Sequence, residues 1–192
     1  MKKTAIDLFC GAGGLSEGFR QAGFHILAGN DIDENAGKTY SITHSDAKFL
    51  LGPIQSISAQ ALMNAAGLSP GELDVLIGGP PCQAYSVYNH QRGMHDERAN
   101  LFREYLRIVE GTQPNWVVME NVTGISSIAN GAIVETIKSE FNRLGYTMNH
   151  AVLKAEEYGV PQERRRIFFI GTKTGMPINF PIKTHGLELI PF

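Results

Sequence analysis

The chain has 192 residues, 43% of them hydrophobic, so it is long enough to bury the core of one ordinary domain. A formal net charge of −2 excludes a globally basic nucleic-acid-binding protein, and any such contact must come from local clusters of basic residues. Two cysteines are too few for a disulfide framework, and no apolar run resembles a signal peptide or a membrane span. We therefore expect a soluble, cytoplasmic protein in a reducing compartment.

Apolar runs alternate with helical patterns along the first 80 residues. The pattern predicts strands at 4–9, 25–32, 48–54 and 73–79. It predicts helices at 15–23, 33–44 and 58–67. Gly23 closes the first of these helices, and Asp33 is the expected N-cap of the second.

The alternation continues in the second half of the chain. The stretch 87–100 is polar and has no periodicity, so it is predicted as a long loop. Helices are predicted at 101–111 and 132–145, and strands at 115–121, 146–155 and 165–173. Strands that alternate with helices predict an α/β fold with a doubly wound, mostly parallel sheet covered on both faces, in three layers.

The first strand leads into a Gly-rich turn and a helix in the stretch DLFCGAGGLSEGF (7–19). In a doubly wound sheet, ligands bind at the carboxyl ends of the strands, where such a turn presents backbone N–H groups. The dinucleotide pattern G-x-G-x-x-G fails at its last position, where Ser16 stands, but Asp31 ends the next strand, where a ribose hydroxyl needs an acceptor. These features favour an adenosine-containing cofactor over a merely structural turn.

A second unusual stretch is GGPPCQAYS (78–86), in which two prolines precede a cysteine. Pro80 and Pro81 have a fixed φ and no backbone N–H, so the stretch is neither ordinary helix nor central strand. Together with DLFCGAGG, MENV and YGVPQERRRIFFIG, in this order, it resembles the successive motifs of the cytosine-C5 DNA methyltransferase family. The resemblance runs from Asp7 to about Gly171. It implies S-adenosylmethionine as cofactor, with S-adenosylhomocysteine as product, and cytosine in double-stranded DNA as substrate.

The resemblance implies four catalytic residues. Cys82 is the nucleophile that adds to C6 of a flipped cytosine and so activates C5 toward the sulfonium methyl. The two prolines before it, called here its proline mount, restrict the loop and favour a reactive position of the sulfur. Glu120 contacts N3 and the exocyclic amine, where a protonated carboxyl would neutralise the charge that develops. Arg164 and Arg166 lie near cytosine O2 and the catalytic loop; strand alternation places both on one side and Arg165 on the other.

Other residues in these motifs receive less specific predictions. Cys10 has no partner base and is predicted to pack rather than react. Arg165 is predicted to be solvated or to contact phosphate, Asn121 to position the nearby loop, and Gln162 to be a structural hydrogen-bonding partner. The loop 87–100 is expected to close over flipped DNA. The histidines lack partners at metal-ligand spacing, so no metal site is predicted.

The resemblance also implies cofactor contacts from Phe9, Gly11, Gly13, Asp31, Ile32, Ile54, Pro81 and Leu101. For Leu101, a plain core position at a helix start is an equal alternative. Pro53 stands where the family has an acid that holds the adenine amine. That replacement removes one hydrogen bond, worth about 1–3 kcal/mol if its partner is left unpaired, so a lower cofactor affinity is expected.

In the family, a target-recognition region and two further motifs follow the part that corresponds to this chain. We expect residues 1–180 to form an incomplete catalytic domain and 181–192 to lead into the absent region. A second polypeptide would supply the rest in a split enzyme; a fragment and a truncated gene product are the alternatives. A bacterial or phage restriction–modification system is the expected setting. Competing functions are a transfer-RNA cytosine-5 methyltransferase, a non-catalytic cofactor-binding subunit and, more weakly, a nicotinamide oxidoreductase.

Overall fold

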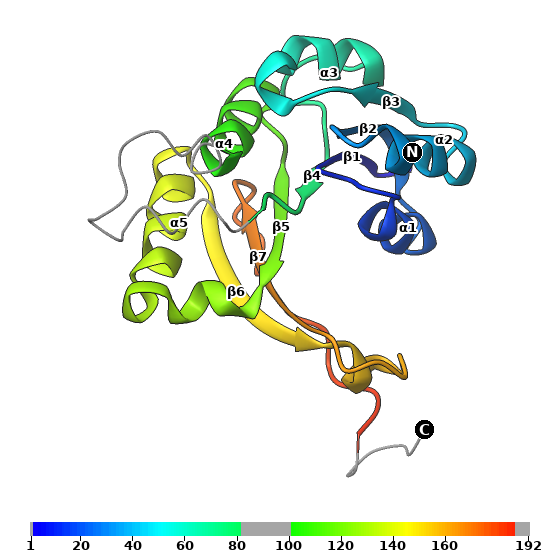
Figure 1. The fold of residues 1–192 in the computed structure, drawn as a ribbon. Coiled ribbons are helices and arrows are strands. Elements are labelled where there is room, and N and C mark those ends of the chain that lie inside the picture. The colour runs from blue at the N-terminus through cyan, green and yellow to red at the C-terminus, as the bar shows by residue number, and fades with distance from the viewer. Residues whose placement is uncertain (1, 82–100, 187–192) are drawn as a thin grey trace, which may run out of the picture.

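The computed structural model describes residues 2–81 and 101–186, which form one twisted sheet with helices packed against it (Figure 1). Its strands are β1 (Thr4–Leu8), β2 (His25–Asp31), β3 (Lys48–Leu51), β4 (Val75–Gly78), β5 (Trp116–Val122), β6 (Thr147–Lys154) and β7 (Arg165–Thr172). Its α-helices are α1 (Gly14–Gln21), α2 (Glu34–Thr43), α3 (Ala59–Ala66), α4 (Leu101–Thr112) and α5 (Ala132–Arg143). Short 3-10 helices span Ile54–Ser56, Thr123–Gly131 and Ala155–Tyr158.

The strand order is β3-β2-β1-β4-β5-β7-β6. The first five strands in this order are parallel, and β7 lies between β5 and β6 and runs antiparallel to both. The predicted doubly wound, mostly parallel sheet is therefore confirmed. Strand β1 pairs with β2 on one side and β4 on the other, so the chain reverses its direction of winding there, and ligands of such sheets bind outside this point.

The strands divide their side chains between two hydrophobic clusters. In β1, Ile6 and Leu8 are buried in the larger cluster, which they share with α3, α4 and α5. Ala5 faces the other way, into a smaller cluster to which α1 contributes. Burial on both faces explains why the central strands are almost uninterrupted apolar runs. Asp7 is the exception in β1, and it faces α1 with Ala5 because side chains alternate along a strand.

Local capping also follows the sequence. The side chain of Asp33 accepts hydrogen bonds from the backbone N–H groups of Asn35 and Ala36 at 2.8 and 3.0 Å, which confirms it as the N-cap of α2. Helix α1 ends at Gln21, and Gly23 follows at φ +91°, the left-handed conformation typical of a helix end.

The half of the sheet formed by β5, β7 and β6 is covered unequally. Four side chains of β5 and β7 face α4 and α5 and are at most 1% exposed: Val117, Met119, Ile167 and Phe169. The alternate side chains on the opposite face are only half-buried: Trp116, Val118, Phe168 and Ile170. On that second face, Leu15 and Phe19 of α1 belong to the same smaller cluster as Trp116 and Val118 of β5, but that cluster includes no described side chain of β7 or β6 (Figure 1).

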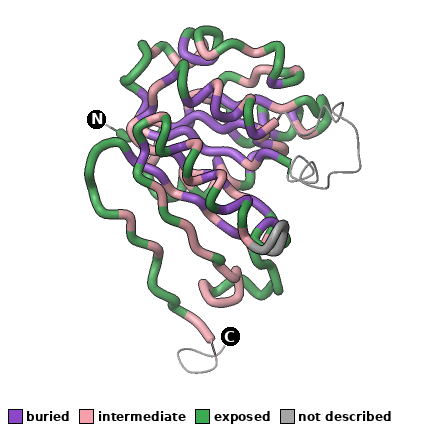
Figure 2. Tube along the Cα trace, turned by 90° about the vertical axis from the view of Figure 1, so that its left-hand side faces the viewer, coloured by how far each residue is buried: buried purple, intermediate pink, exposed green. Residues whose placement is uncertain are grey.

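The segment after β7 runs without regular structure past the 3-10 helix Ala155–Tyr158. The backbone N–H groups of Thr184 and His185 both donate to the carbonyl oxygen of Glu157 at 3.0 Å, and Lys183 forms an ion pair with the Glu157 carboxylate at 2.9 Å. Figure 2 shows mostly exposed residues along this segment and buried residues concentrated in the sheet. None of the helices in the described ranges has both the length and the apolar composition needed to cross a bilayer.

Candidate active site

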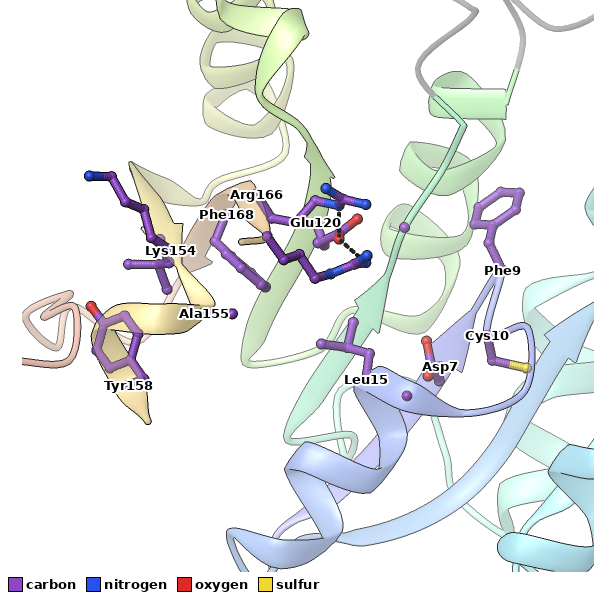
Figure 3. A pocket seen from close by; sticks show the side chains of 14 residues that line it. Asp7, Phe9, Cys10, Leu15, Glu120, Lys154, Ala155, Tyr158, Arg166 and Phe168 are labelled. Carbon is purple, nitrogen blue, oxygen red and sulfur yellow. Dashed lines mark ion pairs between the residues drawn. The ribbon is translucent and has the colours of Figure 1, made fainter. Parts of the chain in front are cut away.

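A cavity of about 660 Å³ opens where the central strands end, at the edge that ligands use in sheets of this type. Its walls come from β1, the Gly-rich turn, the residue after β4, the end of β5 and the β6–β7 hairpin (Figure 3). This volume lies within the range of small-molecule and cofactor sites. Within the described residues, no group of three His, Cys, Asp or Glu side chains could hold a metal ion.

The Gly-rich turn is fastened to the end of β2. The Gly11 N–H donates to Asp31 Oδ2 at 2.7 Å, and the Asp33 N–H donates to Asp31 Oδ1 at 2.9 Å. Asp31 is thus held in place by backbone groups, and each carboxylate oxygen keeps a lone pair for a further donor. The next side chain, Ile32, is 69% exposed. Together they offer a hydroxyl acceptor beside an apolar surface, which suits a nucleoside.

Backbone conformation in the turn explains its glycines. Gly13 has φ +94°, and a Cβ there would collide with the imidazole of His44, so the position requires glycine on two counts. Gly11 has φ +54°. Phe9 also adopts the left-handed conformation, at φ +56°, which is uncommon for an aromatic residue and is found mainly at functional sites.

A buried polar chain lies behind the turn. Ser16 Oγ donates to Asp7 Oδ2 at 2.7 Å and lies 3.1 Å from the Tyr40 hydroxyl, which must donate to it because the serine proton is already used. Asp7 is only 1% exposed, and its Oδ1 has no hydrogen-bond partner. Burial raises the pKa of Asp7 to about 7.

Sequence reasoning missed Asp7 as a site residue and treated Ser16 only as the residue that breaks the dinucleotide pattern. The available signal was a carboxylate inside an apolar strand, two residues before Phe9 and the glycine turn. A lone acid in such a strand must have either a partner or a function, because burying its charge is costly.

Cys10 also lines the cavity but is not poised to react. It is 8% exposed, and burial, together with the nearby carboxyls of Asp7 and Asp31, raises the pKa of its thiol, which disfavours the thiolate. The prediction that Cys10 packs is therefore confirmed.

Glu120, at the end of β5, is held by two arginines from β7 and the loop before it. Arg166 Nε lies 2.9 Å from Glu120 Oε1, and Arg164 Nη2 lies 3.6 Å from the same oxygen (Figure 3). Arg165 points away and pairs with exposed Glu163 at 3.0 Å. The predicted alternation of the three arginines is confirmed, and the structure brings Glu120, Arg164 and Arg166 together at the cavity wall.

The exit from β4 is fixed beside this cluster. Asn121, 3% exposed, donates from Nδ2 to the carbonyl oxygen of Pro80 at 2.9 Å, which confirms it as a residue that positions this loop. Gly79 N–H donates to the Leu8 carbonyl oxygen at 3.3 Å. Cys82 follows Pro81 directly; like the loop 87–100, it lies outside the described residues. Within the described residues, the contact with Asn121 therefore holds Pro80 beside the end of β5, where Glu120 lies.

The remaining predicted cofactor residues differ in their surroundings. Ile54 is 3% exposed and belongs to the main core, and Leu101 is half-buried against the same core, whereas Pro81 is exposed. The carbonyl oxygen of Pro53 is already engaged by the N–H and hydroxyl of Ser56, at 2.9 and 2.8 Å. Because the proline side chain has no polar atom, position 53 also presents no side-chain acceptor to a ligand.

One expectation about the loop before β7 is wrong. Gln162 is exposed, and the hydrogen bond it makes is from its backbone N–H to the Val160 carbonyl oxygen at 2.7 Å. In the part of the chain that the structure describes, its side chain has no structural partner, because the loop turns it toward solvent.

The family profile of C-5 cytosine-specific DNA methylases matches residues 3–189. The type II methyltransferase M.AgeI of Thalassovita gelatinovora is 42% identical over 94% of this chain and 42% of its own length. M.AquIA of Picosynechococcus is 38% identical over 97% of this chain and 78% of its own length. The chain thus spans about half the length of most of these curated relatives, and most of the length of M.AquIA.

Solved structures agree with the fold. A DNA modification methyltransferase encoded within an E. coli prophage superposes with a TM-score of 0.80 at 28% identity, covering 99% of this chain and 52% of that one. The S. pombe Dnmt2 methyltransferase gives a TM-score of 0.70 at 16% identity, covering 93% of this chain and 52% of that one, which supports the fold alone. The family match over residues 3–189, nearly the whole length, shows that the chain belongs to the C-5 cytosine-specific DNA methylase family.

Proposed function

We propose that this chain is the catalytic region of an S-adenosylmethionine-dependent DNA (cytosine-5) methyltransferase of a type II restriction–modification system. The observation that carries the proposal is the Glu120 carboxylate, held by Arg166 and Arg164 at the wall of the cavity and next to the proline mount of Cys82. The type II methyltransferases among its relatives support a DNA substrate.

The residues around the Gly-rich turn fit S-adenosylmethionine. Asp31 offers acceptors for ribose hydroxyls, Ile32 offers an exposed apolar side chain for the adenine ring, and the glycines allow close approach of the backbone. When bound, S-adenosylmethionine supplies the electrophilic methyl group that cytosine C5 takes up, and S-adenosylhomocysteine remains.

The chain's own residues would supply the covalent chemistry. The Cys82 thiolate forms a bond to C6, and the electron pair of the C5–C6 double bond becomes available at C5. Glu120 hydrogen-bonds N3 and the exocyclic amine, so that a proton shared with N3 neutralises the charge as the sulfur adds. After methylation a water molecule removes the C5 proton, the C5–C6 double bond re-forms and the bond to Cys82 breaks. The two arginines hold the carboxylate and would lie near cytosine O2.

The same proposal includes further polypeptide that completes the site, in the same protein or as a second chain. Two observations support it: relatives such as M.AgeI and M1.HphI are about twice as long, and one face of β5, β7 and β6 is half-buried and apolar. Residues 174–186 form no helix or strand in the described part of the chain, and Thr174 and Met176 line a cavity on this face.

Trapping with 5-fluorocytosine tests the function, because fluorine at C5 cannot leave as the proton does and the Cys82 adduct persists. The chain would be incubated with S-adenosylmethionine and 5-fluorocytosine in duplex DNA or in transfer RNA. Each reaction would be run with and without a polypeptide carrying the part of M.AgeI that this chain does not match. We expect a protein–DNA adduct that denaturing electrophoresis resolves and that Cys82→Ser abolishes. An adduct with transfer RNA alone would transfer the proposal to RNA, and no adduct in any arm would refute it.

A further inference from the structure

The second oxygen of Asp7 is an unmet acceptor at the base of the cavity. Ser16 Oγ satisfies Oδ2, while Oδ1 is buried without a partner. Figure 3 shows the carboxyl between Leu15 and Cys10, on the side of the cavity opposite Tyr158. A buried carboxyl with an unmet oxygen is costly, so such a group in a site wall indicates a missing donor.

No cation in the described part of the chain is free to fill that position. The basic side chains that line the cavity are already paired: Arg164 and Arg166 with Glu120, and Lys154 with Glu157 at 3.4 Å. The ionisable groups packed around Asp7 are acidic or neutral: Asp31 from β2, Tyr40 from α2, Tyr105 from α4 and Cys10 from the turn. His44, the nearest imidazole behind the turn, lies 3.2 Å from the Gly13 carbonyl oxygen. The missing donor is therefore expected to come from a ligand.

We propose that Asp7 accepts the α-ammonium group of the methyl donor, and that the carboxyl loses its proton to solvent when this ammonium arrives. The inference rests on the proposed function, which makes the ligand an adenosyl amino acid with one ammonium group. When the ligand binds, the Asp7 O–H bond breaks and the proton goes to water. The carboxylate then pairs with an ammonium that keeps all its protons. Asp7 is thus a positioning residue for the cofactor and does not touch the base.

The pH dependence has a definite sign. With the Asp7 pKa raised to about 7 by burial, the free site is about half protonated at pH 7. A bound ammonium stabilises the charged form, so binding releases about half a proton at pH 7, about 0.9 at pH 6 and about 0.1 at pH 8. Affinity therefore rises with pH up to about 7, by close to tenfold per unit well below it, and levels off above.

Calorimetry on the full chain separates this inference from the cofactor assignment. S-adenosylhomocysteine would be titrated at pH 6, 7 and 8 in buffers of low and high ionisation enthalpy, and 5′-methylthioadenosine, which lacks the amino-acid end, would serve as the comparison ligand. We expect proton release with the first ligand only. Binding of S-adenosylhomocysteine without proton release, or equal release with both ligands, would overturn the role of Asp7 alone. No binding of either ligand would overturn this inference together with the cofactor assignment.

Two matched variants locate the proton. Asp7→Asn keeps the size and the Ser16 contact, and it should abolish proton release and weaken S-adenosylhomocysteine binding about 10- to 100-fold, with methylthioadenosine unaffected. Asp33→Asn removes a nearby carboxylate while preserving the N-cap, and it should leave proton release unchanged. Undiminished proton release in Asp7→Asn would show that another group titrates.

Discussion

At the scale of single residues, three consecutive arginines have unequal roles because Arg165 and Arg166 begin strand β7, where side chains alternate, and Arg164 directly precedes it. Arg166 contacts Glu120 at 2.9 Å and also donates to the Arg165 carbonyl oxygen at 2.8 Å, whereas Arg165 pairs with an exposed glutamate. The backbone contact holds the Arg166 guanidinium in one orientation, and the guanidinium in turn orients the Glu120 carboxylate.

Arg166→Ala should therefore slow adduct formation with 5-fluorocytosine DNA by about 100-fold, because Glu120 loses its main anchor and the base loses a cationic neighbour. Arg165→Ala is the matched control, with an expected change of less than about threefold in the rate at saturating DNA. The measurement is the single-turnover rate of adduct formation. Equal losses in the two variants would contradict the assignment by strand alternation.

The buried Asp7 carboxyl should also affect stability. Its contribution to the free energy of unfolding should fall as pH rises, which is opposite to that of an ordinary salt-bridged acid. Because burial raises its pKa from 3.8 to about 7, the cost of burying it is absent below pH 3.8, grows between pH 3.8 and 7, and is complete above. Asp7→Asn should therefore increase the free energy of unfolding at pH 8, by at most about 4 kcal/mol, and change it little near pH 4. Urea unfolding at the two pH values measures this.

Asp74 is the contrasting acid for the same experiment. Partial burial raises its pKa, but hydrogen bonds from Lys3 and from the Thr4 backbone outweigh this and lower the pKa overall. Asp74→Asn should therefore destabilise the protein at neutral pH and lose this effect in acid. A destabilised Asp7→Asn at pH 8 would show that the Asp7 carboxylate has a stabilising partner in solution even without cofactor.

At the scale of elements, the end of β3 explains the expected weakness of cofactor binding. The strand stops at Leu51 because Gly52 has φ +138° and Pro53 cannot donate to the sheet. Asn30 then holds this end by donating from Nδ2 to the carbonyl oxygens of Leu50 and Gly52, at 2.8 and 3.0 Å. The backbone is in place for a cofactor contact, but the side chain at position 53 offers none.

Pro53→Asp should restore that contact and increase the affinity for S-adenosylhomocysteine by about tenfold, the effect of one hydrogen bond to a charged acceptor. Aspartate is also a favourable N-cap for the 3-10 helix Ile54–Ser56, so the change should not disturb the fold. Pro53→Ala controls for loss of the proline ring. Calorimetric titration compares the three proteins, and identical affinities for the Asp and Ala variants would exclude position 53 from the adenine site.

The elements also show how far sequence patterns predict structure. Strands β1 and β4 and the turn between β1 and α1 were predictable, because buried parallel strands are continuous apolar runs and glycines mark left-handed conformations. The insertion of β7 between β5 and β6 was not, because strand order depends on pairing between segments far apart in the chain. In the site, strand alternation predicted the arginines, whereas the bond from Ser16 to Asp7 depends on how α1 packs on β1.

At the scale of the whole molecule, the sheet has one incompletely covered face. A cavity of about 370 Å³ lies between α1 and β5 on this face, with Phe19, Phe24, Trp116, Val118 and Met176 in its lining. Met176 is 59% exposed. The cavity lies at the amino ends of β1, β4 and β5 and at the end of α1, whereas the candidate active site lies at their carboxyl ends and at the start of α1, so a polypeptide that reaches both must run along this side of the sheet. Apolar surface of this kind is typical of a position where another segment packs.

Trp116 is the sole tryptophan of the chain and lies on this face, so its fluorescence reports directly on what covers it. Adding the complementary part of M.AgeI in trans should shift its emission to shorter wavelength, because burial removes water from the indole. Val118→Arg should abolish both the shift and the adduct with 5-fluorocytosine DNA, since a buried unpaired charge opposes packing. It should leave S-adenosylhomocysteine binding within about threefold, because Val118 lines the second cavity and not the first. Ile42→Arg, at an 80% exposed position on α2, is the matched control and should change neither the emission shift nor the adduct. Adduct formation by the Val118→Arg protein at the unsubstituted rate would mean that the site is completed elsewhere on the molecule.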